Sequence, residues 1–181
     1  MNGFLRSDLG AQLPLHISLS APLVLTTSQK VDFQSNFERS LTRTPFRTFC
    51  VNPTSLAWVS NFEKTRFFLV LRLSRPKDDQ LNRLLDLSNE CATQFHLPLL
   101  YKQGVVYAGE SANKNKRPER KAEDSSSAFH ISIAWTLQEP SEDERATVQS
   151  VILPSELAEK DIRFDTVKLK IGNVVNDITL V

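Results

Sequence analysis

A short unit occurs twice in this 181-residue chain, once as Leu-His16-Ile-Ser18-Leu-Ser and once as Phe-His130-Ile-Ser132-Ile-Ala. Both copies are apolar enough to form strands, and they lie 114 positions apart. Because alternate side chains of a strand point to the same face, each histidine projects together with its serine. If the two strands are neighbours in one sheet, two imidazoles and two hydroxyls converge on one small cavity.

The remaining pattern predicts strands interleaved with helices. The predicted strands are Leu13–Ser20, Phe46–Val51, Ser55–Ser60, Arg66–Leu73, Phe129–Leu137, Ile162–Phe164, Val167–Ile171 and Val174–Leu180. The predicted helices are Ser28–Arg43, with Ser28 as its cap, Asp78–Phe95 and Glu142–Val151. A tight turn is expected at Gly172-Asn173. This order indicates an α+β or α/β fold in a single domain spanning residues 1–181.

The segment Gly104–Ser127 differs from its surroundings. It contains few large apolar residues after Tyr107 and ends in three serines, so we expect a disordered insertion. Its basic residues are Lys114, Lys116, Arg117, Arg120 and Lys121. The simpler interpretation is that these basic residues lie on a solvated loop. The alternative is that they contact phosphate or act in nuclear import.

Charge and cysteine content limit the class of protein. The net charge is +1, so an anion site must come from local clustering. Cys50 and Cys91 form no metal-binding or redox motif, and we expect two reduced, partly buried thiols, as in the cytosol or nucleus. Neither a membrane-spanning run nor a secretory signal is apparent. These features indicate a soluble intracellular protein.

Two imidazoles and two hydroxyls in one cavity suit cleavage of a phosphodiester without a metal. One neutral imidazole takes a proton from the attacking oxygen, and one protonated imidazole donates a proton to the departing oxygen. Serine hydroxyls can hydrogen-bond the nonbridging phosphate oxygens. In RNA the attacking oxygen can be the neighbouring 2′-hydroxyl, which gives a 2′,3′-cyclic phosphate. The simpler interpretation, a buried core histidine, fits one such motif better than two.

Other conspicuous residues have ordinary interpretations. His96 ends a predicted helix, where capping or surface packing is expected. Trp58 and Trp135 are expected in the core. Lys64 and Arg66 precede an apolar strand, and they either face RNA or form a solvated edge.

From about Leu13 onward, the chain resembles the U6 snRNA phosphodiesterase family of the 2H phosphoesterase superfamily. Four stretches carry the resemblance: Leu15-His-Ile-Ser-Leu-Ser20, Asn61-Phe-Glu-Lys-Thr-Arg-Phe-Phe-Leu69, Phe129-His-Ile-Ser-Ile-Ala-Trp135 and Val167-Lys-Leu-Lys-Ile-Gly-Asn173. The second motif followed by Ala-Trp is the most specific of them. The resemblance implies a two-lobed fold with antiparallel sheets flanked by helices and a central cleft.

The resemblance also implies a function: a nuclear, metal-independent 3′→5′ exonuclease that trims the oligouridine tail of U6 RNA and leaves a cyclic phosphate or 3′-phosphate. It implies no cofactor, and we expect a monomer. By motif, His16 and His130 are the acid–base pair, and Ser18 and Ser132 contact the phosphate. The motif does not say which histidine is the base; we favour His130 as base and His16 as acid. Tyr101 is the best match to a tyrosine that stacks on the terminal base.

Several alternatives stay open. Tyr107 competes with Tyr101 for the stacking role, because the insertion changes the usual spacing to the second motif. The same acid–base pair also serves an enzyme that opens or forms 2′,3′-cyclic phosphates in RNA-end healing. Family members usually carry a further segment before the first motif, so we expect an incomplete first lobe with an exposed sheet edge. A further alternative is therefore a catalytically impaired protein that binds RNA ends.

Overall fold

The structure is a computed structural model that describes residues 1–6, 10–102 and 124–181. The chain divides into two compact units, each built from three separate stretches. Unit 1 comprises Met1–Ser18, Phe49–Asp78 and Ser126–Arg163, and unit 2 comprises Leu19–Thr48, Asp79–Ser125 and Phe164–Val181. Both copies of the His-Ile-Ser motif belong to unit 1.

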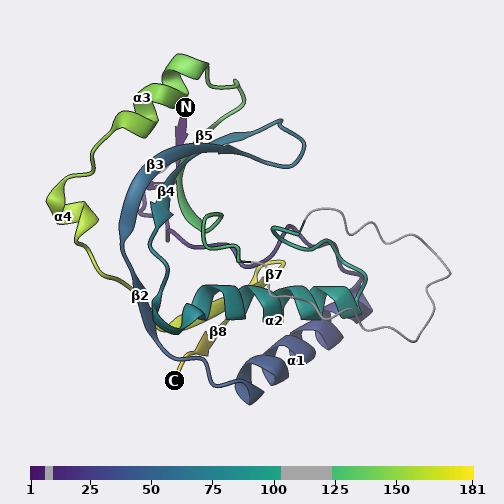
Figure 1. The fold of residues 1–181 in the computed structure, drawn as a ribbon. Helices are drawn as coiled ribbons and strands as arrows, with labels where there is room; N and C mark the ends of the chain where they lie inside the picture. Colours follow the sequence, from purple (N-terminus) through teal and green to yellow (C-terminus); the bar gives the residue numbers. More distant parts are fainter. Residues whose placement is uncertain (7–9, 103–123) are drawn as a thin grey trace. The chain divides into compact units, whose positions relative to one another are not determined.

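The centre of unit 1 is a four-stranded antiparallel sheet in the order β1-β5-β4-β3. Its strands are β1 (Asn2–Gly3), β3 (Pro53–Ser60), β4 (Phe67–Leu73) and β5 (His130–Thr136), and Figure 1 shows β3, β4 and β5 side by side. A bulge in β5 opposite Leu69 and Val70 shifts the register between β4 and β5. The predicted strands at Ser55–Ser60, Arg66–Leu73 and Phe129–Leu137 are confirmed within two residues at each end, and the strand predicted at Phe46–Val51 begins three residues later, at Phe49.

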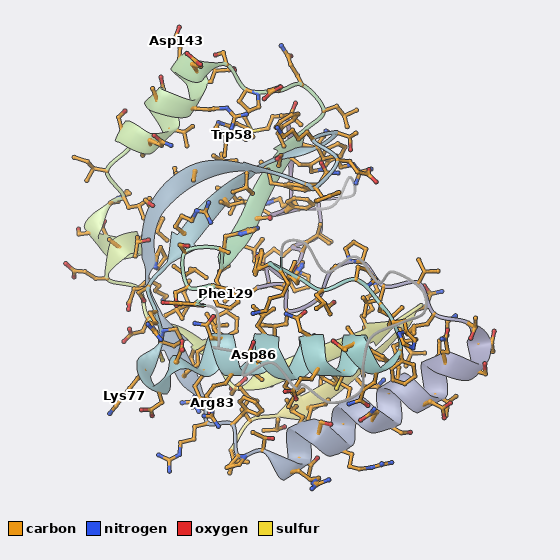
Figure 2. All side chains as sticks on the ribbon, turned by 45° about the vertical axis from the view of Figure 1, so that its right-hand side comes forward. Trp58, Lys77, Arg83, Asp86, Phe129 and Asp143 are labelled. Atoms are coloured by element: carbon orange, nitrogen blue, oxygen red, sulfur yellow. The ribbon has the colours of Figure 1, made fainter. Side chains whose placement is uncertain are left out.

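Helix α3 (Glu142–Ser150) packs on β3, and a short helix, α4 (Ser155–Ala158), follows it. Ser141 caps α3, accepting a hydrogen bond from the backbone N–H of Glu144. Trp58 lies on the side of β3 that carries α3 (Figure 2). A separate two-stranded sheet joins β2 (Phe49–Val51) to β6 (Ile162–Phe164). The sequence pattern predicted α3 and β6 but not α4 or β1.

Unit 2 is built on two long helices that lie against each other (Figure 1), α1 (Thr27–Arg43) and α2 (Gln80–Gln94), the latter preceded by a 3-10 turn at Lys77–Asp79. Phe33 of α1 packs edge-on against Phe95, with ring centroids 5.3 Å apart. The cap of α1 is Thr26, not Ser28, because Thr26 and Gln29 form a reciprocal capping box. The hairpin of β7 (Thr166–Ile171) and β8 (Val174–Thr179) turns at Gly172, whose φ of 61° suits glycine, as predicted.

Two buried asparagines of α2 hold the chain on either side of residues 103–123. The Asn82 side chain accepts a 2.9 Å hydrogen bond from the backbone N–H of Ser125 and donates to Asp79 and Asp124. Two turns further along, Asn89 donates to the carbonyl of Leu100 and accepts from its N–H. The predicted disordered insertion therefore extends too far at its C-terminal end, because the structure describes residues 124–127 and Ser125 is buried. The rest of the prediction for 104–127, including Tyr107 and the basic cluster, lies outside the described residues.

Segment Leu13–Ser20 is not the regular strand that was predicted. Its one ladder contact is a bridge between Ile17 and Ile131 of β5. Pro14 has no N–H to donate to a ladder, and the chain passes into unit 2 after Ser18. Strand β1, near the start of the chain, lies along the same edge of β5, since it pairs with Ala134 and Trp135.

Candidate active site

The bridge between Ile17 and Ile131 sets the two motifs side by side in antiparallel orientation. In that register the residue before Ile17 lies opposite the residue after Ile131. His16 therefore lies opposite Ser132, and Ser18 lies opposite His130. Alternation about the bridge predicts that all four side chains project from the face opposite to the two isoleucines. It also predicts that the two histidines lie on a diagonal, each opposite the serine of the other motif.

Burial agrees with this alternation. Ile131 is only 4% exposed, and Ile17 is half-buried. His16 and Ser18 are exposed, whereas His130 and Ser132 are half-buried. The candidate site thus has one histidine open to solvent and one held within the sheet.

A backbone carbonyl fixes the tautomer of His130. Nδ1 of the ring lies 2.7 Å from the carbonyl oxygen of Ala128. A carbonyl can only accept a hydrogen bond, so Nδ1 carries the proton and donates it. In the neutral ring, Nε2 is then unprotonated and is the nitrogen available as a base.

Arg72 of β4 is the cross-strand partner of His130. Its Nη1 donates to the carbonyl oxygens of Ser127, at 2.8 Å, and Ala128, at 3.4 Å. The guanidinium therefore holds the backbone turn that orients the imidazole. Sequence reasoning missed both Arg72 and the Ala128 carbonyl. The available signal was the single charged residue inside the apolar run of residues 67–73.

The environment lowers the pKa of His130 below its ordinary value of 6.5. Burial is the largest cause, because it disfavours the charged ring, and the positive charges of Arg72 and His16 act in the same direction. The hydrogen bond to the Ala128 carbonyl opposes them by stabilising the protonated ring. The net effect keeps His130 neutral near pH 7, as a general base requires.

For the other residues singled out in the sequence, the structure gives burial and backbone conformation. Tyr101 belongs to unit 2, where it is half-buried with φ of 57°, and its stacking role stays a prediction. Trp58 and Trp135 are half-buried, so neither is a full core residue as predicted. Of the two cysteines, Cys91 is buried as expected, and Cys50 is exposed. His96 follows α2 with φ of 55°.

Two further observations concern metals and membranes. Within the described ranges, no three His, Cys, Asp or Glu side chains gather as metal ligands would. The prediction of a reaction without a metal remains a prediction. In the same part of the chain, no helix is both long and apolar enough to cross a membrane.

Solved structures share this fold. Usb1 of Kluyveromyces marxianus matches with a TM-score of 0.63 and 17% identity, over 99% of this chain and 80% of that one. The same protein with uridine monophosphate gives a TM-score of 0.60 and 19% identity, over 99% and 81%. These matches show a 2H phosphoesterase-like fold, which confirms the predicted fold class.

The chain belongs to the HVSL family, described as an uncharacterised conserved protein, whose sequence profile matches residues 1–179. It is also 29% identical, over 198 aligned positions, to U6 snRNA phosphodiesterase 1 of Neurospora crassa. That alignment covers 96% of this chain and 49% of the relative, so the chain spans about half the length of this curated relative. The predicted resemblance to the U6 snRNA phosphodiesterase family is confirmed.

Proposed function

We propose that this chain is an RNA phosphodiesterase that removes nucleosides one at a time from the oligouridine 3′ end of U6 snRNA, as a nuclear monomer without a metal. The observation that carries the proposal is the antiparallel bridge between Ile17 and Ile131, which brings the two His-Ile-Ser motifs side by side. The name of the Neurospora crassa relative supports U6 snRNA as substrate. The Kluyveromyces marxianus structure with uridine monophosphate supports uridine as the nucleoside that is recognised.

In the proposed reaction, Nε2 of His130 takes the proton from the 2′-hydroxyl of the penultimate nucleotide. The resulting oxygen attacks the phosphorus of the 3′-phosphodiester, and the bond from phosphorus to the 5′-oxygen of the last nucleoside breaks. His16 donates a proton to that departing oxygen. Ser18 and Ser132 donate hydrogen bonds to the nonbridging oxygens as negative charge develops.

The product is an RNA with a 2′,3′-cyclic phosphate and a free nucleoside. The same two histidines with their protonation states exchanged serve hydrolysis by water, which opens the ring to a 3′-phosphate. Exposure of His16 suits a residue that must regain a proton from solvent in each cycle.

The direct test incubates a uridine-tailed RNA with purified protein in excess EDTA. We expect stepwise shortening, and we expect His130→Ala to slow it by about 10²–10⁴-fold. An RNA with a single 2′-deoxy nucleotide in the tail should be trimmed until that nucleotide becomes penultimate. A strict requirement for divalent metal, or passage through the deoxy position, contradicts the proposal.

A further inference from the structure

One face of β4 continues from the candidate site to the turn before the strand. Arg66, Phe68, Val70 and Arg72 are spaced two residues apart, so they project to the same face. Arg72 pairs with His130, so this is the face of the histidines. The four-residue step from Arg72 to Phe68 covers about 13 Å.

At the far end of this row, a guanidinium lies over an indole. Phe68 pairs with Trp135 of β5, and Cζ of Arg66 lies 5.1 Å from the centroid of the Trp135 ring. Arg66 is exposed and Trp135 is half-buried. Within the described residues no carboxylate pairs with Arg66. The indole of Trp135 thus supports one side of the Arg66 guanidinium, and no carboxylate of the described residues compensates the positive charge of Arg66.

The turn that carries Arg66 is internally braced. The side-chain oxygen of Asn61 accepts hydrogen bonds from the backbone N–H of Thr65, at 2.9 Å, and of Arg66, at 3.0 Å. The N–H of Asn61 donates to the carbonyl of Arg66 at 3.0 Å. Because both polar groups of the Arg66 backbone are held, little backbone entropy is lost when Arg66 binds a ligand.

An apolar floor extends between this pair and the serines. The rings of Phe4 and Phe68 stack with centroids 6.3 Å apart and planes 14° apart, and both are half-buried. The N–H of Phe4 donates to the carbonyl of Ile133, one residue after Ser132. Between Phe68 and Arg72, Val70 is fully buried under other parts of the chain.

We propose that Arg66, supported by Trp135, binds the RNA on the 5′ side of the scissile phosphate, stacking on a base and neutralising a phosphate. This inference rests on the proposed function. A planar guanidinium over an aromatic ring is a known platform for single-stranded RNA bases. An enzyme that removes one nucleoside at a time has a single nucleoside on the 3′ side. That nucleoside carries no phosphate beyond the scissile one, so a further phosphate contact belongs to the body of the RNA.

The test measures binding of oligouridine by fluorescence anisotropy, with His130→Ala as the background in every variant to prevent turnover. We expect Arg66→Ala to raise the Kd roughly 5- to 150-fold, the range expected for loss of one stacked base. It should also lower the slope of log affinity against log salt by about 0.7, the value for one contact with a single-strand phosphate. Arg66→Lys should restore the slope but not the affinity. Lys64→Ala is the matched control, since it removes an exposed cation from the same turn.

Kinetics then separate this site from the chemistry. With His130 intact, Arg66→Ala should lower kcat/KM for a longer oligouridine much more than for the dinucleotide UpU, which has no upstream body. Equal losses on both substrates, or equal effects of the Lys64 and Arg66 variants on binding, overturn the inference. A wild-type chain that binds oligouridine through Arg66 but cleaves neither substrate contradicts the proposed function alone.

Discussion

Arg72 and His130 donate hydrogen bonds to the same acceptor, the backbone carbonyl oxygen of Ala128. The Arg72 guanidinium also holds the preceding carbonyl, that of Ser127. The imidazole is thus oriented by a turn that is itself fixed from the neighbouring strand. Arg72 is a positioning residue in this account.

Arg72→Met should lower kcat and raise the pKa of His130, because the turn loses its donor and the ring loses a nearby positive charge. Burial remains the main cause of the low pKa, so the value should stay below 6.5. NMR titration of the His130 ring measures the shift, and Arg72→Lys, which keeps the charge but not the fork of donors, should recover the pKa better than the rate. A further fall in the pKa of His130 contradicts this role.

The lowered pKa of His130 also predicts how kcat/KM depends on pH. The neutral base is present above its pKa, so the acid limb of kcat/KM should lie below pH 6.5. In the unfolded chain the ring binds a proton more readily, so this group should make the protein less stable as pH falls below about 6.5. Nitrogen chemical shifts should show the proton of the neutral ring on Nδ1. A proton on Nε2 contradicts the assignment of His130 as base.

Ser132→Ala should lower kcat by about 10²–10³-fold, the usual cost of one donor to developing negative charge. KM should change less, since the hydrogen bond strengthens in the transition state. Ser20→Ala is the control, because Ser20 is an exposed serine just beyond the first motif. Equal effects of the two substitutions would exclude a phosphate contact for Ser132.

Asn82→Ala should lower the free energy of unfolding by about 1–3 kcal/mol, because it leaves the buried N–H of Ser125 without an acceptor. Asn176→Ala offers a contrast: the buried Nδ2 of Asn176 has no hydrogen-bond partner among the described residues. Its removal should cost much less. Urea denaturation of both variants measures the difference, and an equal loss would contradict the clamp at Ser125.

Sequence reasoning located most of the fold because its elements have strong local signals. The apolar run of residues 67–73 and the periodicity of residues 80–94 determine β4 and α2 almost to the residue. It failed at Leu13–Ser20, where an apolar composition suggested a strand and the structure has a single bridge. That segment lies at a sheet edge, and its conformation depends on β5, which is far away in the sequence.

The candidate site was predictable in its residues but not in its arrangement. Alternation along each motif predicted that His16 and Ser18 share a face, as do His130 and Ser132. Which histidine faces which serine depends on the register across the bridge. The contributions of Arg72 and the Ala128 carbonyl depend on tertiary contacts that no local pattern contains.

The most direct test of the acid–base assignment uses an RNA whose scissile 5′-oxygen is replaced by sulfur. A thiolate leaves without protonation, so it needs no general acid, whereas the 2′-hydroxyl still needs a base. We predict that this substrate restores cleavage by His16→Ala to nearly the wild-type rate and does not restore cleavage by His130→Ala. Restoration of His130→Ala in place of His16→Ala would contradict the account.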